Sequence, residues 1–374
     1  MLKALENALE KRREEDRLRM LRDELPPVDF SSNDYLGLGA EEVNLSADRS
    51  SASSSRSITG NYPRLRTLET FLAERFQGDE ATFFQSGFEA NQALFSMLSD
   101  LGVTVLFDEY IHASIRSSLF RSRGKAWSFK HNDLTDLRMK LERSEGECVV
   151  VTEGLFSMHG DSPDLEAISA LKSEFDFALI VDEAHSNGFF GEHGIGTSES
   201  QDVIADVDVR IQTFGKAFGI QGAAIVQKRE SRSAVRREKT SIKEALANFS
   251  RPFIYTTAPS PLLTELCFHG LRRWDQAQEQ RELLGENIQH YLMRAKDYAE
   301  ASMNRGQVQF YSVGGNRATL QCSQAFSERG YDLKAILSPT VPEGQEGLRI
   351  CLHAFNSKAE IDAIFDIFDY IRTN

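Results

Sequence analysis

Two charged residues in the middle of the chain have side chains and sequence neighbours that are suited to reactions on amino-acid substrates. Lys216 lies in a glycine-rich run, residues 209–222, and Asp182 ends an apolar run and is followed by Glu-Ala-His. A lysine amine can form a Schiff base with pyridoxal phosphate (PLP), and a carboxylate can keep the pyridine nitrogen of PLP protonated, so that the ring accepts electrons. We therefore predict that Lys216 and Asp182 hold PLP. Taken alone, Lys216 could equally be a surface lysine in a glycine-rich loop.

A second set of residues could bind the phosphate of that cofactor. Ser86, Gly87 and Phe88 precede a helical stretch, residues 89–94, and the N–H groups at a helix N-terminus form a ready anion site. Thr213, three residues before the lysine, could add a hydroxyl to the same phosphate. Each feature has an ordinary alternative, because Ser-Gly often only caps a helix and threonine is common in strands. Their occurrence together favours a phosphate site.

Two histidines have settings that suit contact with the cofactor ring. His112 follows an apolar run, and its flat ring could stack on the pyridine. His185 lies three residues after Asp182, and an imidazole, which titrates near neutral pH, could assist proton transfer beside the phenolic oxygen. A zinc site of Asp182, His185 and His193 is the alternative. It would leave the lysine without a role, so we predict no metal.

Residues from about 64 to 230 alternate helical segments with short apolar runs. The runs are continuous and rich in β-branched residues, which is typical of parallel strands buried on both faces. They are residues 103–107, 148–152, 178–181, 209–212 and 223–226. Ligands of such sheets bind beyond the carboxyl ends of the strands. The candidate site residues that follow these runs are His112, Ser157, Asp182, His185 and Lys216. We predict an α/β fold with a mostly parallel sheet and a site at that edge.

The two ends of the chain differ from this central part. Residues 2–23 have an amphipathic helical pattern that Pro26-Pro27 ends. After a long helical region, residues 261–304, the runs 308–311, 318–321 and 348–352 predict strands, and the stretch from Ser357 predicts a capped helix with one apolar stripe. We predict three parts: an N-terminal arm (1–45) that packs with the small domain, a large cofactor domain (46–260), and a connecting helix with a small α+β domain (261–374).

Composition limits the partners of the chain. The 374 residues carry a formal net charge of −13, with a pI near 5.2, which argues against nucleic acid or an anionic membrane as the main partner. The four cysteines form no C-x-x-C pair, as expected in a reducing compartment, and no apolar run approaches the ~20 residues of a membrane span. We predict a cytoplasmic enzyme of small metabolites.

Nine ordered blocks along nearly the whole chain resemble the PLP-dependent α-oxoamine synthases. The blocks are Phe30–Leu38, Gln85–Phe88 with Ala90–Gln92, His112–Ser114, His131–Asp133, Thr152–Met158, Asp182–His185, Thr213–Lys216, Ile254–Thr257 and Pro339–Pro342. The resemblance implies the fold-type-I PLP-dependent transferase architecture, with a large domain on a mostly parallel seven-stranded sheet and a smaller α+β C-terminal domain. It also implies a homodimer whose active sites lie at the subunit interface.

The resemblance implies roles for residues by position. Lys216 would carry PLP and act as a base, Asp182 would bind the pyridine nitrogen, and His112 would stack on the ring. The other implied cofactor contacts are Ser157 and His185 at the phenolic oxygen, Gly87, Phe88 and Thr213 at the phosphate, and Thr256 or Thr257 at the phosphate of the neighbouring subunit. The implied substrate contacts are Arg349 at the carboxylate of the amino acid, with Arg19, Asn33 and Thr340 on the substrate side.

The implied reaction is the decarboxylating condensation of an amino acid with an acyl thioester. The blocks are most similar to the biotin-pathway branch of the family, which implies L-alanine with pimeloyl-CoA or a pimeloyl-acyl carrier protein. A branch that condenses glycine with acetyl-CoA and a catalytically silent relative with the same fold are the alternatives. Three departures border the acyl side, namely the short segment before Asp29, the serine-rich residues 51–55, and Ser186-Asn187 after His185. They leave the acyl donor open.

Overall fold

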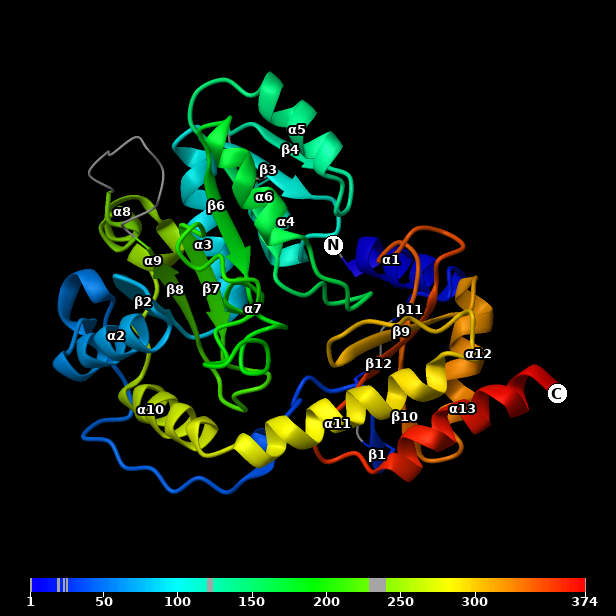
Figure 1. The fold of residues 1–374 in the computed structure, drawn as a ribbon. Coiled ribbons are helices and arrows are strands. Elements are labelled where there is room, and N and C mark those ends of the chain that lie inside the picture. The colour runs from blue at the N-terminus through cyan, green and yellow to red at the C-terminus, as the bar shows by residue number, and fades with distance from the viewer. Residues whose placement is uncertain are drawn as a thin grey trace. The chain divides into compact units, whose positions relative to one another are not determined.

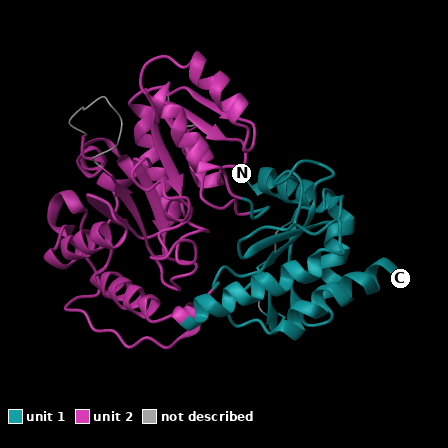
Figure 2. Cartoon of the chain, viewed as in Figure 1, with its two compact units in different colours: residues 1–35, 158–161, 279–374 teal, residues 36–157, 162–278 magenta. Residues whose placement is uncertain are grey.

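The computed structural model describes residues 2–18, 21–22, 24, 26–119, 124–228 and 240–373. The chain forms two compact units, drawn in teal and magenta in Figure 2. Unit 1 consists of Met1–Tyr35, Met158–Asp161 and Glu279–Asn374, and unit 2 of Leu36–Ser157 and Ser162–Gln278. The edges of the units therefore fall after residues 35 and 278. The three-part organisation with limits after residues 45 and 260 stays a prediction.

Unit 2 is built on a seven-stranded sheet, which confirms the predicted fold class. In sheet order the strands are β2 (Glu80–Phe84), β8 (Ala223–Gln227), β7 (Val209–Thr213), β6 (Ala178–Asp182), β5 (Cys148–Glu153), β3 (Thr104–Asp108) and β4 (Ala126–Phe129). Only β8 runs antiparallel to its neighbours, and the other pairs are parallel. The apolar runs did not predict β2, which begins with Glu80, or the edge strand β4, whose first three residues are not fully buried.

Helices cover both faces of this sheet (Figure 1). One face packs against α3 (Gly87–Asp100), α4 (Ala113–Leu119), α8 (Ile242–Phe249) and α9 (Arg251–Ile254), and the other against α5 (Leu134–Arg143) and α6 (Leu165–Ala170). Consecutive strand residues such as Val149 and Val150 belong to opposite cores, which is why the strands are apolar at successive positions. The remaining helical elements of unit 2 are η1 (Leu38–Ala40), η2 (Arg56–Gly60), α2 (Pro63–Arg75), η3 (Leu171–Ser173), α7 (Thr197–Ser200) and α10 (Pro261–Asp275).

Unit 1 contains two small sheets with helices. The antiparallel sheet has the order β11 (Lys334–Ile336), β12 (Gly347–Cys351), β9 (Val308–Ser312), and β1 (Val28–Asp29) pairs in parallel with β10 (Tyr331–Asp332). The helices are α1 (Leu2–Glu14), α11 (Gln278–Ala295), α12 (Asn316–Ser327) and α13 (Lys358–Thr373). The predicted capping box of α13 is confirmed, because Ser357 Oγ accepts from Glu360 N at 3.2 Å and Glu360 Oε2 accepts from Ser357 N at 2.7 Å.

Three predictions about the two ends of the chain were wrong in detail. Residues 318–321 lie in helix α12, not in a strand, and its buried residues Thr319, Cys322 and Phe326 follow helical spacing. A four-residue run is too short to distinguish the two periods. Helix α1 ends at Glu14 rather than near residue 23, and Asp16 has a positive φ of 53°. The helical region predicted over 261–304 is two helices, α10 and α11.

A buried ion cluster holds the end of the serine-rich stretch of residues 50–57. Arg56 and Glu69 form an ion pair, and Lys243 Nζ lies 2.6 Å from Glu69 Oε2. Glu69 also accepts from Phe83 N at 2.9 Å, so one carboxylate joins η2, α2, β2 and α8. The side chains of Arg56 and Glu69 are only 6% and 2% exposed. The stretch is therefore tied to the core at its C-terminal end.

We expect Glu69→Gln to lower the free energy of unfolding by about 3–5 kcal/mol, because it leaves Arg56 buried without its counter-charge. Glu265→Gln is the matched control, since Glu265 pairs with Arg64 at a site where the side chains are 24% and 44% exposed. An exposed pair contributes about 0–1 kcal/mol. Urea unfolding measures both. Equal losses in the free energy of unfolding would show that the Glu69 cluster contributes no more to stability than the exposed pair.

Candidate active site

Polar side chains follow the carboxyl ends of four parallel strands in unit 2. His112 comes after β3, Ser157 after β5, Asp182 and His185 at the end of β6, and Thr213 and Lys216 at the end of β7. These strands are parallel to one another, so their carboxyl ends meet at one edge of the sheet. That edge is where ligands of open α/β sheets bind. The structure thus brings the predicted cofactor residues to a common edge.

Lys216 lies in the connection between the antiparallel strands β7 and β8. Phe214 N donates to Gly222 O at 2.9 Å, Ile220 N donates to Phe214 O at 3.0 Å, and Gly219 N donates to Lys216 O at 2.9 Å. Gly219 has a φ of 63°, a left-handed conformation that favours glycine. The fully buried ring of Phe214 anchors the loop. Lys216 itself is half-buried, so its side chain is held by a fixed backbone at the edge of the sheet.

The N-terminus of α3 and the end of β7 form a close pair. A Cβ added at Gly87 would overlap Thr213 Oγ1, so only glycine lets the helix start this close to the hydroxyl. Ser86 caps α3, because its Oγ accepts from Glu89 N at 3.2 Å, and Phe88 is half-exposed. Backbone N–H groups of a 14-residue helix beside a threonine hydroxyl form a donor set that fits a phosphate.

Asp182 and His112 are held by a short chain of hydrogen bonds. Asp182, which is 5% exposed, accepts from Asn91 Nδ2 at 2.8 Å and from Ala184 N at 3.0 Å. Asn91 Nδ2 also donates to Ser114 Oγ at 3.0 Å, and that oxygen lies 2.7 Å from His112 Nδ1. A buried carboxylate with fixed donors suits a protonated ring nitrogen as its partner. These residues therefore fit the pyridine end of PLP.

The charges at this edge influence one another. Burial lowers the pKa of His112, the nearby Lys216 lowers it further, and Asp182 opposes the shift. Burial raises the pKa of Glu153 well above its usual range, and the neighbouring Asp182 carboxylate raises it further. Glu153 Oε1 accepts from His112 N at 2.5 Å. The site therefore favours a neutral imidazole and a neutral Glu153 beside the Asp182 and Lys216 charges.

The other predicted residues of unit 2 lie near the same strand ends or in the turn after α9. Ser157 and His185 are 7% and 5% exposed, in the loops after β5 and β6. Thr256 is half-buried and Thr257 is exposed, and Ala258 N, next to them, donates to Ser54 O at 3.0 Å. An exposed position is compatible with the predicted reach to a neighbouring subunit. That reach stays a prediction.

Unit 1 holds the predicted substrate residues. Arg349 is central in β12 and 8% exposed, and its guanidinium donates to Ser31 O at 3.0 Å and to Asn33 Oδ1 at 3.3 Å. Asn33 is thus a neighbour of Arg349, although 316 residues separate them in sequence. Thr340 is exposed in a turn, where its N–H donates to Leu337 O at 2.8 Å. Arg19 lies outside the described residues.

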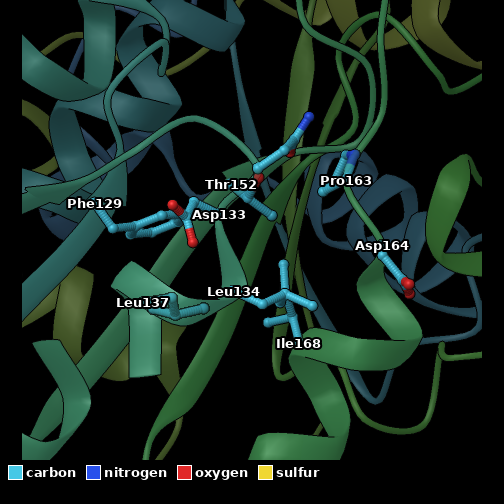
Figure 3. Close-up of a pocket in the computed structure, with 9 residues that line it drawn as sticks. Phe129, Asp133, Leu134, Leu137, Thr152, Pro163, Asp164 and Ile168 are labelled. Atoms are coloured by element: carbon cyan, nitrogen blue, oxygen red, sulfur yellow. The ribbon is translucent and has the colours of Figure 1, made fainter. Parts of the chain in front are cut away.

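Unit 2 also contains a small cavity near the end of β5. This cavity of about 40 Å³ lies beside Thr152 (Figure 3). It is lined by Asp133 and Asp164 and by Leu137 and Ile168, which belong to the core between the sheet and helices α5 and α6. It has room for a few water molecules but not for an amino acid or an acyl thioester. Among the described residues, no group of three or more His, Cys, Asp or Glu side chains is placed to hold a metal ion. No helix in the described ranges is long and apolar enough to cross a membrane.

Sequence reasoning missed three residues of this site. Asn91, Ser114 and Glu153 all contact the predicted cofactor residues, although only the blocks of resemblance contained them. Asn91 lies four residues after Gly87 and so shares its face of the helix, which is a signal that sequence can supply. Glu153 is a charged residue at the end of an otherwise apolar strand, which is a second such signal. Nothing local distinguishes Ser114 from the other serines of α4.

Comparison with known proteins defines the family. The model of the family "Aminotransferase class I and II" matches residues 26–368. Relatives from Neisseria meningitidis (serogroup A) and Haemophilus influenzae (strain 86-028NP), both provisionally named 8-amino-7-oxononanoate synthase, are 34% and 33% identical to this chain. The alignments cover 89% and 91% of this chain and 88% and 90% of those proteins.

Solved structures agree with that result. An 8-amino-7-oxononanoate synthase from Francisella tularensis has a TM-score of 0.76 and 25% identity, over 92% of this chain and 98% of that one. A Sphingomonas wittichii serine palmitoyltransferase has a TM-score of 0.82 and 26% identity, over 91% and 86%. The S. paucimobilis serine palmitoyltransferase with bound PLP and myriocin shares the fold, with a TM-score of 0.85 and 23% identity over 98% and 96%.

The chain belongs to the aminotransferase class I and II family. It is a PLP-dependent enzyme of the α-oxoamine synthase branch, whose members use an amino acid and an acyl thioester. The predicted family, enzyme class and cofactor are thereby confirmed. The roles of the individual residues stay predictions that the geometry makes specific.

We expect Lys216→Ala to lose the covalent link to PLP while it keeps the fold. Borohydride reduction of the purified wild type should attach PLP to the peptide that contains Lys216, and mass spectrometry should find no such adduct in the variant. Lys228→Ala is the control variant, because Lys228 follows β8, away from the carboxyl ends of the parallel strands. Its Nζ lies 3.8 Å from Asp79 Oδ1. A PLP adduct on another lysine of the wild type would refute the assignment.

Proposed function

We propose that the enzyme condenses L-alanine with a pimeloyl thioester to form 8-amino-7-oxononanoate, a step of biotin synthesis. The bond forms between the α-carbon of alanine and the acyl carbonyl carbon, the carrier thiol leaves, and the alanine carboxylate departs as CO₂. The observation that carries the proposal is the similarity, over about nine-tenths of both chains, to two relatives of that provisional name. The carrier is coenzyme A or an acyl carrier protein.

The residues of unit 2 have matching roles in this proposal. PLP, when bound, supplies an electron sink for the charge left on the α-carbon of the amino acid. The amine of Lys216 first tethers the cofactor and then takes the α-proton as a general base. Asp182 keeps the ring nitrogen protonated, His112 stacks on the ring, and Ser157 with His185 binds the phenolic oxygen. Ser86, Gly87, Phe88 and Thr213 provide the phosphate site at the N-terminus of α3.

Arg349 has the properties of the carboxylate anchor in this proposal. A guanidinium can hold a carboxylate through two parallel charge-assisted hydrogen bonds. Its bonds to Ser31 O and Asn33 Oδ1 use one terminal nitrogen and fix the plane of the group. These two acceptors are a backbone carbonyl and an amide oxygen, neither of which carries a formal charge. Arg19 and Thr340 belong to the same proposal as substrate-side residues.

We expect a homodimer, because Thr256 and Thr257 complete the phosphate site of the neighbouring subunit in this proposal. Double substitution of these threonines by valine should weaken PLP binding without loss of the dimer. Sedimentation velocity measures the assembly, and a fully active monomer at assay concentration would refute it.

Among four substrate combinations, we expect L-alanine with pimeloyl-CoA to give the highest kcat/KM. One methyl group distinguishes alanine from glycine and accounts for about 1–3 kcal/mol, so that preference is modest, whereas the choice between pimeloyl and acetyl thioesters should be larger. Steady-state assays of both amino acids with both thioesters measure this. If glycine with acetyl-CoA is fastest, the proposed product is wrong and the glycine-condensing branch replaces it.

We expect Arg349→Ala to raise KM for alanine by about 10- to 100-fold, because a hydrogen bond to a charged group contributes about 1.5–3 kcal/mol. The KM for the acyl thioester should change less than about threefold, since the thioester has no contact with this anchor in the proposal. Arg349→Lys keeps the charge but loses the planar fork, so it should fall between wild type and alanine variant. Equal effects on both KM values would contradict a carboxylate anchor.

A further inference from the structure

Asn91 joins the two side chains that face the cofactor ring in the proposed site. It is 2% exposed on α3, and its Nδ2 lies 2.8 Å from Asp182 Oδ2 and 3.0 Å from Ser114 Oγ. The orientation of the amide follows from Asp182, because a carboxylate only accepts hydrogen bonds and the atom beside it must be a donor. Both amide hydrogens are thereby used, one for Asp182 and one for Ser114.

The direction of the remaining bonds is also determined. The backbone N–H of Ser114 donates to His112 Nδ1 at 3.2 Å, and a backbone N–H cannot accept, so Nδ1 carries no proton. The Ser114 hydroxyl accepts from Asn91 and therefore has its own proton available for Nδ1, 2.7 Å away. The proton of a neutral His112 ring then lies on Nε2. The lowered pKa of His112, caused first by burial, agrees with a neutral ring.

We propose that Asn91 is a positioning residue whose single amide orients both the Asp182 carboxylate and, through Ser114, the neutral Nε2–H form of His112. The proposal rests on the proposed roles of Asp182 and His112 at the ring of PLP. It goes beyond them, because it assigns the orientation of both groups to one side chain outside the proposed set of cofactor and substrate contacts.

Helix α3 explains why this residue lies where it does. Asn91 is one helical turn after Gly87, so both project from the same face of α3. The start of the helix forms the proposed phosphate site with Thr213. The next turn positions Asp182 and, through Ser114, His112. Fully buried neighbours, Ala90, Ala93 and Leu94, pack this turn against the sheet. One rigid element therefore sets the spacing between the phosphate end and the ring end of the site.

Three variants test the proposal. Asn91→Ala removes both hydrogen bonds of the amide, whereas Ser114→Ala removes the hydroxyl that links Asn91 to His112 and keeps the bond from Asn91 to Asp182. Asn287→Ala is the matched control, because Asn287 is also a buried asparagine, 4% exposed, whose Nδ2 makes two bonds, to His353 O and Asn356 O, within unit 1. Any loss that follows only from the removal of a buried amide should appear in the control.

The first measurement is the dissociation constant of PLP, from titration of the cofactor-free full chain. We expect Asn91→Ala to raise it about 10- to 100-fold, the effect of one lost hydrogen bond to a charged group. Ser114→Ala and Asn287→Ala should stay within about threefold of wild type. If Asn91→Ala fails to fold, Asn91→Asp replaces it, since the shape is kept and a carboxylate beside Asp182 should weaken PLP binding at least as much.

The second measurement is the ¹⁵N spectrum of the histidines in the holoenzyme, with His112 assigned through His112→Asn. We expect an unprotonated Nδ1 and a protonated Nε2 near neutral pH in wild type and in Asn287→Ala. Both Asn91→Ala and Ser114→Ala should shift the Nδ1 signal, because the donating hydroxyl is misaligned or absent. A purely structural role for Asn91 would not move this signal selectively.

The outcomes separate this inference from the proposed function. A protonated Nδ1 in wild type, or PLP binding by Asn91→Ala within threefold of wild type, overturns the inference. Loss of turnover in Asp182→Asn together with normal PLP binding in Asn91→Ala rejects the inference and leaves the proposed role of Asp182 intact. Near-normal turnover of Asp182→Asn with bound PLP rejects the proposed role of Asp182 instead.

Discussion

The burial of Asp182 is the constraint on which the rest of the site depends. A carboxylate taken out of water is costly unless donors surround it. Asn91 supplies one donor from α3, and Ala184 N supplies the other from the turn that follows β6. That turn is held by the next residue, Glu183, which is fully buried and accepts from Thr197 N at 2.8 Å and Ser198 N at 2.9 Å. Two consecutive acids thus have opposite tasks: Asp182 belongs to the site, and Glu183 secures the loop behind it.

Arg349 is the corresponding buried cation, which needs hydrogen-bond acceptors as Asp182 needs donors. Its guanidinium is buried in unit 1 and donates to a backbone carbonyl and to an amide oxygen. Arg56, in contrast, has the carboxylate of Glu69 as its partner and serves the stability of unit 2. A guanidinium can hold a carboxylate through two charge-assisted hydrogen bonds, which is the role that we propose for Arg349.

Much of the fold was readable from the sequence because burial imposes strict patterns. Strands covered on both faces must be apolar at consecutive positions, so five strands of the seven-stranded sheet were visible as runs. The half-buried edge strand β4 had no such run. Residues 318–321 were misassigned because four residues fit either period, and only the packing of Thr319, Cys322 and Phe326 shows the helix.

By itself, the sequence determined which residue types follow each strand, and parallel strands then place His112, Ser157, Asp182 and Lys216 at one edge. Only the tertiary structure decided how these groups are held. The bond from Asn91 to Asp182 joins residues 91 positions apart, and the bond from Arg349 to Asn33 spans 316. No local pattern encodes such pairs, because hydrogen bonds depend on ångström-scale distances that the packing of whole helices and strands sets. The local sequence therefore indicated which residues could do the chemistry, whereas the orientation of their side chains depends on contacts between residues far apart in the chain.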